Sequence, residues 1–229
     1  GCFSNLACTD TIEIYNPQTN SWTYLYDLAL TSRKNHAASL LPDGTVLITG
    51  GMNYGTPYNT YYNTTFLFNP VGDHLTSKAA MTATRSEHFM AVRRDGKVLV
   101  VGGFKTGILG NIFIKSTELY DPVSNTWTQA ASLTGSKRSE AVAFVHNDKA
   151  YIVTGLNNGT YLNDFWSYDA TTNSWTELRK INDVTDDSFD DDYDDNIKRS
   201  NGTIFVLGDK AYLSSGSRSG IIATTWEYD

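Results

Sequence analysis

The chain has 229 residues, enough to bury a large core, and its aromatic content of 13% favours half-buried strands over helices. Its formal net charge is −7, but eight aspartates lie between Arg179 and Lys198, so the acidity is local. No basic stripe suited to nucleic acid is visible, and no apolar run reaches the roughly 20 residues of a membrane-spanning helix. We therefore expect a soluble protein with no nucleic-acid partner and no transmembrane segment.

The chain begins with its two cysteines, Cys2 and Cys8. Their spacing could close a small disulfide loop in an oxidising compartment. Three Asn-x-Ser/Thr sequences, at Asn63, Asn158 and Asn201, agree with a secreted protein. We therefore expect an extracellular or cell-surface location.

The first predicted element is a hairpin. Thr11 to Tyr15 alternates in polarity, Asn16-Pro17 begins a turn, and Trp22 follows Tyr15 by seven residues. The same pattern returns at 68–75, 120–127 and 168–175. We interpret the aromatic residue before the turn and the Trp after it as packing between adjacent sheets, not as a ligand site.

Glycine-ended strands recur along the chain, at 45–51, 97–103, 149–155 and 210–216. Each follows a further predicted strand, within 36–41, 88–92, 140–145 or 203–207, and a tight turn such as Asp43-Gly44. Similarity at a period near fifty residues indicates one structural unit used several times. Each unit has four short antiparallel strands.

These residues resemble Kelch repeats. The family's glycine pair is matched by Gly50, Gly51, Gly102 and Gly103, its turn by Tyr120-Asp121-Pro122, its tryptophan by Trp22, Trp127 and Trp175, and its arginine by Arg33, Arg85 and Arg138. From Lys149 onward the chain looks most like Kelch-type secreted or surface proteins of bacteria. It departs from the pattern at Leu75 in place of Trp and at Thr154 and Ser215 in place of the first glycine.

The resemblance implies an all-β fold, a Kelch-type β-propeller or a segment of one, with four-stranded antiparallel blades. About four to five blades are represented in a single domain over 1–229. We expect a partial first blade at 1–30, blades near 33–77, 85–130 and 138–178, an acidic loop at 179–198 and a last partial blade at 199–229. An open propeller would expose strand edges, so we expect flanking sequence or a partner chain in a larger assembly.

Alternating strand direction places the connections after the glycine-ended strands on one rim of the propeller. These connections, 52–62, 104–114, 156–162 and 217–223, are predicted to be long and irregular, and such loops often build binding surfaces. The candidate binding residues are Asn53, Tyr54, Tyr58, Tyr61, Phe104, Asn157, Tyr161 and Arg218. Tyr and Asn suit adaptable recognition of a protein or glycan. Alternatively, half of these aromatic residues pack their own loops.

The sequence offers no catalytic motif. The four histidines are scattered, and the metalloprotease, phosphate-loop and nucleophile-elbow patterns are absent. The aspartate run could bind calcium through Asp186, Asp187, Asp190, Asp191 and Asp192, although it lacks the glycine and glutamate of an EF-hand. The other interpretation is a solvated loop whose charge aids solubility. No other cofactor is expected.

We therefore predict a non-catalytic extracellular binding module that recognises a protein or glycan through its long-loop rim. The alternative is a structural or assembly subunit whose open propeller edges pack on another chain.

Overall fold

The computed structural model describes residues 8–55, 57–108, 110–178 and 197–228. Every element named in these residues is a β-strand, which confirms the all-β fold class. The chain forms two compact units, residues 1–86 and 87–229, and each is considered by itself. The single domain over 1–229 stays a prediction.

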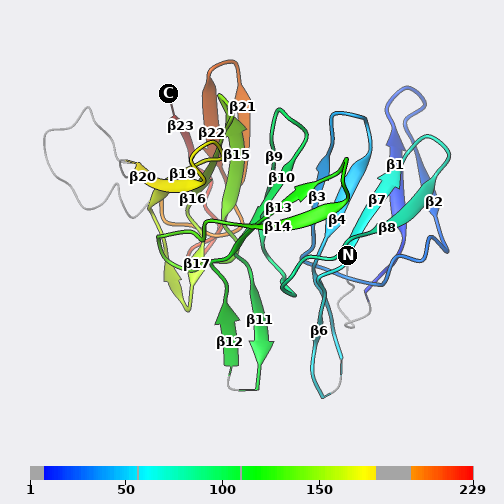
Figure 1. Cartoon of the computed structure of the whole chain (residues 1–229), viewed down its shortest axis with the longest axis horizontal. Coiled ribbons are helices and arrows are strands. Elements are labelled where there is room, and N and C mark those ends of the chain that lie inside the picture. The colour runs from blue at the N-terminus through cyan, green and yellow to red at the C-terminus, as the bar shows by residue number, and fades with distance from the viewer. Residues whose placement is uncertain (1–7, 56, 109, 179–196, 229) are drawn as a thin grey trace, which may run out of the picture. The chain divides into compact units, whose positions relative to one another are not determined.

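In its described residues the first unit contains one four-stranded antiparallel sheet and two hairpins (Figure 1). The sheet has the order β3-β4-β7-β8, with strands Ala37–Leu40, Val46–Thr49, Thr65–Asn69 and His74–Lys78. The separate hairpin pairs β1 (Ile12–Asn16) with β2 (Ser21–Leu25). Between β4 and β7 the chain forms a small hairpin of β5 (Met52–Asn53) and β6 (Thr60–Tyr61).

The second unit repeats the same sheet. Its first sheet contains β9 (Phe89–Val92), β10 (Val98–Val101), β13 (Thr117–Asp121) and β14 (Thr126–Ala130). The next contains β15 (Val142–His146), β16 (Lys149–Val153), β19 (Phe165–Asp169) and β20 (Ser174–Leu178). The last contains three strands, β21 (Thr203–Leu207), β22 (Lys210–Ser214) and β23 (Thr225–Tyr228).

The connections between second and third strands are more regular than the sequence indicated. Beside β5–β6, the chain forms the hairpins β11 (Phe104–Gly107) with β12 (Gly110–Phe113) and β17 (Leu156–Asn157) with β18 (Thr160–Tyr161). Figure 1 shows β11 and β12 running away from their sheet side by side. The prediction of irregular segments was wrong here, because short polar and glycine-containing runs can close two-stranded ladders.

The first strands begin later than predicted. The ladders start at Ala37, Phe89 and Val142, so the preceding His36, His88 and Glu140 lie outside them. The physical cause is a residue in left-handed conformation just before each strand, such as Glu87 with φ 53° and Glu140 with φ 55°. A left-handed residue cannot continue an extended ladder.

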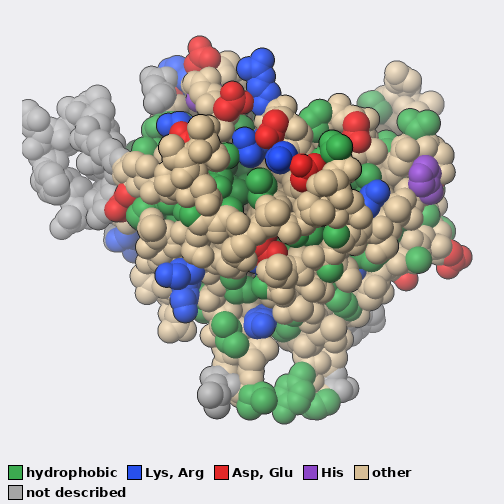
Figure 2. Space-filling model, viewed as in Figure 1, with side chains coloured by type: hydrophobic (Ala, Val, Ile, Leu, Met, Phe, Trp, Pro, Cys, Tyr) green, Lys and Arg blue, Asp and Glu red, His purple; other side chains and the backbone are tan. Residues whose placement is uncertain are grey.

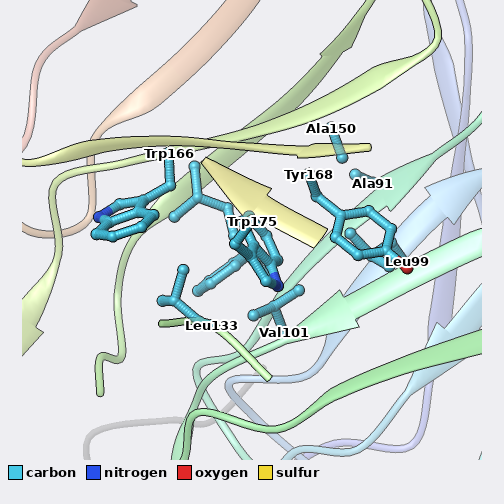
Figure 3. Close-up of a cluster of buried hydrophobic side chains, with 10 residues drawn as sticks. Ala91, Leu99, Val101, Leu133, Ala150, Trp166, Tyr168 and Trp175 are labelled. Carbon is cyan, nitrogen blue, oxygen red and sulfur yellow. The ribbon is translucent and has the colours of Figure 1, made fainter. Parts of the chain in front are cut away.

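The core lies where neighbouring sheets pack face to face. In the second unit, Leu99 and Val101 of β10 pack with Ile152 of β16 and with Trp166 and Trp175 of the same sheet as β16 (Figure 3). All five are at most 8% exposed. Burying side chains of this size contributes roughly 1.5–3 kcal/mol each, so contact between sheets is a main source of stability in this unit.

The glycine that ends each second strand is required by close backbone approach. A Cβ on Gly51 would lie 2.7 Å from the Lys34 carbonyl oxygen, and its φ of 94° is one that side chains disfavour. The Gly51 N–H donates to the Arg85 carbonyl at 2.9 Å, and Gly103 makes the equivalent bond to Arg138 at 2.8 Å. Each bond ties the end of one second strand to the residues that precede the next first strand.

The repeated Tyr and Trp face each other across the hairpin between third and fourth strands. Ring centroids are 5.0 Å apart for Tyr120 and Trp127 and 5.1 Å apart for Tyr168 and Trp175. Trp175 also reaches the neighbouring sheet, where its Nε1–H donates to the Ala131 carbonyl at 2.8 Å. Both Tyr–Trp pairs therefore pack within their own hairpin. Trp175 in addition contacts the neighbouring sheet, as the interpretation of packing between sheets predicts.

Candidate functional site

Buried arginines hold the base of the connections 52–62, 156–162 and 217–223. Arg33, Arg138 and Arg199 are at most 1% exposed. Their Nη1 groups donate to the carbonyls of Gly50 at 2.7 Å, Thr154 at 3.0 Å and Ser215 at 2.9 Å, respectively. Burial lowers the pKa of Arg33 and of Arg199, because desolvation disfavours the charged form. The carbonyl bonds offset part of that cost and fix where the connection leaves the sheet.

Arg138 is paired with a carboxylate. Its two Nη groups donate to the two carboxylate oxygens of Asp164, at 2.8 and 2.5 Å. The Trp166 Nε1–H also donates to Asp164, at 2.6 Å. At the equivalent positions Thr64 accepts from Arg33 through its hydroxyl, and Thr224 accepts from Arg199 through its hydroxyl and its carbonyl. The Arg138–Asp164 pair is bidentate and nearly buried, which fixes the orientation of both side chains.

Backbone bridges join the connections 52–62, 156–162 and 217–223 to the start of their own sheets. Lys34 and Met52 exchange two N–H to carbonyl bonds, at 2.8 and 2.9 Å. Ser139 and Leu156 do the same at 2.9 Å in both directions, and Ser200 with Ser217 at 3.0 and 2.9 Å. The hairpins therefore rise from a fixed base. We call the connections 52–62, 104–114, 156–162 and 217–223 the hairpin rim, and consider it within each unit separately.

The hairpin rim of the first unit carries four predicted binding residues on β5–β6. Asn53, Tyr54 and Tyr61 are half-buried at the base of the hairpin. The Lys34 ammonium donates to the Tyr54 hydroxyl and lies 3.9 Å from the centroid of its ring. Tyr58, near the tip, is 73% exposed. Of these four, Tyr58 is the side chain best placed to contact a partner.

The hairpin rim of the second unit carries the remaining four. Phe104 packs on Phe113 of the same hairpin with ring centroids 6.0 Å apart, as the alternative of self-packing loops predicts. Asn157 and Tyr161 are half-buried on β17–β18. The Arg218 N–H donates to the Gly220 carbonyl at 2.9 Å, and its side chain is half-buried. These residues follow three successive second strands of one unit.

Sequence reasoning missed the most exposed apolar side chains on the hairpin rim of this unit. Ile108, at the tip of β11–β12, is 93% exposed, and Ile221 is 95% exposed. Ile112 on β12 is 47% exposed. The predicted binding residues were chosen mainly as Tyr and Asn, whose side chains suit recognition, so aliphatic residues were not among them. The available signal was an apolar residue directly after Gly107, in a hairpin too short to bury it.

Two sets of predicted residues fall wholly or partly outside the described ranges. The calcium candidates, Asp186, Asp187, Asp190, Asp191 and Asp192, lie outside them, and so does Cys2. Cys8 is disulfide-bonded. Across the described part of the chain, no three metal-ligating side chains gather in one group, and no helix there is long and apolar enough to span a membrane.

The four-stranded antiparallel sheet is repeated along the chain, and its second strand ends in a glycine, or in Thr-Gly or Ser-Gly, beside a buried arginine. These features define a Kelch-type β-propeller fold. The chain belongs to the Kelch-repeat family: the family model described as the KLHDC2/KLHL20/DRC7 Kelch-repeats domain matches residues 1–216. The chain is also similar to a solved structure titled "Structure of YjhT", with a TM-score of 0.69 and 17% sequence identity. The match covers 86% of this chain and 62% of that one and shows a common fold.

Curated relatives include Kelch-like protein 36 of Mus musculus, 27% identical over 170 residues. Kelch-like protein terF of Aspergillus terreus is 30% identical over 177 residues, and beta-scruin of Limulus polyphemus 29% over 174. These alignments cover 72%, 71% and 71% of this chain but 27%, 38% and 18% of the relatives. The chain thus spans about a quarter of the length of Kelch-like protein 36.

The comparisons correct one expectation. The relatives include Kelch-like proteins 36 and 23 and beta-scruin, which are intracellular proteins, so the predicted extracellular or cell-surface location is wrong. Kelch-repeat propellers generally mediate protein–protein interactions, and the Kelch-like relatives are generally non-catalytic. Protein binding is therefore the class of function that the family supports. That this chain lacks catalytic activity stays a prediction.

Proposed function

We propose that this chain is a non-catalytic module that binds a protein partner through its hairpin rim. The observation that supports the proposal is that the base of a rim hairpin is fixed by hydrogen bonds while its tip is exposed. The hairpin β5–β6 is anchored by the paired backbone bonds of Lys34 with Met52, while Tyr58 is 73% exposed beyond that base. Exposed aromatic residues on a rigid support are frequent energetic centres of protein interfaces.

The test compares two exposed residues at opposite ends of one sheet. Tyr58→Ser removes the rim aromatic, and Val71→Ser is the matched control, since Val71 is 81% exposed in the turn between β7 and β8. Partners captured by the immobilised chain are quantified by mass spectrometry. We expect Tyr58→Ser to lose at least about tenfold of a specific partner, with capture by Val71→Ser unchanged. Equal capture by both variants contradicts binding through the rim, and a glycan partner would instead appear as capture on glycan arrays.

A second candidate is a structural subunit that packs another chain against β1–β2. A cavity of about 760 Å³ lies in the first unit, lined by apolar side chains that include Ile12, Ile14 and Phe68. Trp22 on the same hairpin is 55% exposed, whereas its repeat equivalent Trp175 is 8% exposed. Exposed apolar surface beside an open strand edge favours assembly.

Ile14→Asp distinguishes the two candidates. A charge in the cavity should abolish association with a chain that packs there, and should leave capture through the rim intact. The measurement is native mass by light scattering, run together with the capture assay. An unchanged native mass in the variant, where the wild type is an assembly, contradicts the structural role.

A further inference from the structure

The hairpin β11–β12 differs from the other rim hairpins in its chemistry. Residues 103–116 contain two lysines, Lys105 and Lys115, and no Asp or Glu. Its exposed apolar side chains are Ile108 at the tip and Ile112 on the shaft. By contrast, the tip of β17–β18 is Asn158-Gly159, which is polar.

The geometry of the hairpin separates an apolar end from a cationic shaft. Lys105 pairs with Ile112 in the ladder, so both side chains lie on one face, and Phe104 and Phe113 stack on the other. At about 3.3 Å per residue, Lys105 lies roughly 10 Å behind Ile108. In Figure 2 hydrophobic side chains lie at the bottom of the view, where the rim hairpins end, and Lys or Arg side chains lie above them.

Packing directs the apolar end outward. The Ile112 side chain covers Gly107, where a Cβ would lie 2.8 Å from Ile112 Cδ1, so these two residues close one face of the shaft. Thr106 donates to the Asn111 amide oxygen at 3.0 Å on the other face. The shaft is thus closed by its own contacts, and Ile108 has 93% of its surface exposed.

We propose that the end of β11–β12 is a peripheral anchor for an anionic lipid surface. An apolar side chain enters the boundary between headgroups and acyl chains to a depth of about 5–10 Å, which brings the Lys105 ammonium to the level of the headgroups. The charge complementarity commits the site to anionic lipid. No ion pair occupies Lys105 or Lys115 among the described side chains, so both cations are available to phosphate or carboxylate groups.

This inference goes beyond protein capture by the rim. The anchor uses the end of one hairpin, whereas the proposed protein site centres on Tyr58 in the other unit. One hairpin supplies weak, reversible association, because a single apolar insertion is marginal without a second signal. Each lysine near an anionic surface should strengthen binding about fivefold, so salt dependence is an expected property.

The test uses the 229-residue chain and sedimentation with vesicles of phosphatidylcholine alone or with about a third phosphatidylserine. We expect binding to the anionic vesicles that weakens as salt rises from about 0.1 to 0.5 M. Ile108→Asp should reduce binding at least tenfold, and Lys105→Glu at least fivefold. The matched control is Val123→Asp, because Val123 is 96% exposed in the turn between β13 and β14 of the same sheet. Its binding should equal that of the wild type.

A second measurement reports insertion directly. The native Cys8 is disulfide-bonded, so Ile108→Cys or Val123→Cys provides one reactive thiol for a polarity-sensitive fluorophore. Anionic vesicles should shift the emission of the label at 108 to the blue and leave the label at 123 unchanged. Wild-type binding by Ile108→Asp, equal loss in Val123→Asp, or no shift at 108 overturns the proposal. Absent vesicle binding, with partner capture reduced by Ile108→Asp, overturns it in favour of a protein pocket.

Discussion

Thr154 occupies a backbone position where the equivalent residue in the preceding sheet is Gly102. Its φ is 61°, a left-handed value that a β-branched side chain adopts only under strain. It is fully buried, and no partner for its hydroxyl is found within the described ranges. The position is held because the Thr154 carbonyl accepts from Arg138. The hydrogen bond from Arg138 to this carbonyl thus stabilises the fold by more than the left-handed conformation of Thr154 costs.

Replacing Thr154 by glycine should raise the free energy of unfolding by about 1 kcal/mol, because left-handed strain is relieved. The equivalent Gly102→Ala should have the opposite effect, since a Cβ there would lie 2.7 Å from the Arg138 carbonyl oxygen. Urea unfolding of both variants provides the measurement. Destabilisation by Thr154→Gly would show that its buried methyl contributes more than the strain costs.

Asp164 and Thr224 occupy equivalent positions in two repeats but bind their arginines differently. Asp164 accepts from Arg138 through its carboxylate, and Thr224 accepts from Arg199 through its hydroxyl and carbonyl. Asp164→Ala should cost about 3 kcal/mol of unfolding free energy, because Arg138 is left buried without its carboxylate. Thr224→Ala should cost about 1 kcal/mol, since Arg199 keeps its bonds to the carbonyls of Ser215 and Thr224. Equal losses in thermal or urea unfolding would argue against a special role for the ion pair.

At the scale of the element, the hairpins between third and fourth strands share one turn design. An Asn or Asp oxygen accepts the N–H two residues later, as Asp121 does for Val123 at 2.9 Å. The residue closing the turn is left-handed, with φ of 53° at Asn125 and 49° at Asn173. Its amide oxygen accepts the hydroxyl of the paired tyrosine, at 3.0 and 2.8 Å.

Asn173 has one additional role, since its oxygen also accepts the Ala131 N–H from the neighbouring sheet at 2.8 Å. Asn173→Gly preserves the left-handed backbone and removes both bonds, so we expect a loss of about 2 kcal/mol. Asn20→Gly likewise preserves a left-handed backbone and removes the bond to the Tyr15 hydroxyl, so it should cost about 1 kcal/mol. Chemical denaturation of the two variants would reveal this order, and an inverted order would refute it.

The sequence was sufficient for these elements and insufficient for the rim. Turns and glycine-ended strands are dictated locally by Pro17, Gly44 or Gly51, so their positions could be read directly. The hairpin β11–β12 depends on cross-strand contacts, such as that of Phe104 with Phe113. Such contacts join residues on different strands, so a local sequence pattern does not predict them. The exposure of Ile108 likewise depends on which other residues pack near it in three dimensions. The residue type alone does not show this.

For the molecule as a whole, the contribution of a repeated residue depends on the sheet that faces it. Trp175 is 8% exposed between two sheets, whereas Trp22 on β2 is 55% exposed. Both residues follow the same sequence rule and pair with a tyrosine at 5.1 Å. Repeat proteins are stabilised largely through interfaces between neighbouring units, so equal motifs need not have equal energies.

Trp175→Ala should therefore cost about 3–5 kcal/mol of unfolding free energy, and Trp22→Ala less than about 1 kcal/mol in the isolated chain. The measurement is equilibrium unfolding followed by circular dichroism, which does not depend on the tryptophans removed. A large loss from Trp22→Ala would mean that another chain or copy covers this residue in solution.

The paired backbone bonds at the foot of the rim connections 52–62, 156–162 and 217–223 have a practical consequence. Lys34 with Met52, Ser139 with Leu156 and Ser200 with Ser217 use main-chain atoms alone. Such bonds are insensitive to side-chain identity, so the amino acids beyond them can be exchanged while the sheets stay intact. The fold should therefore accept foreign peptide segments grafted between residues 157 and 160, which makes it a candidate scaffold for displaying designed recognition sequences.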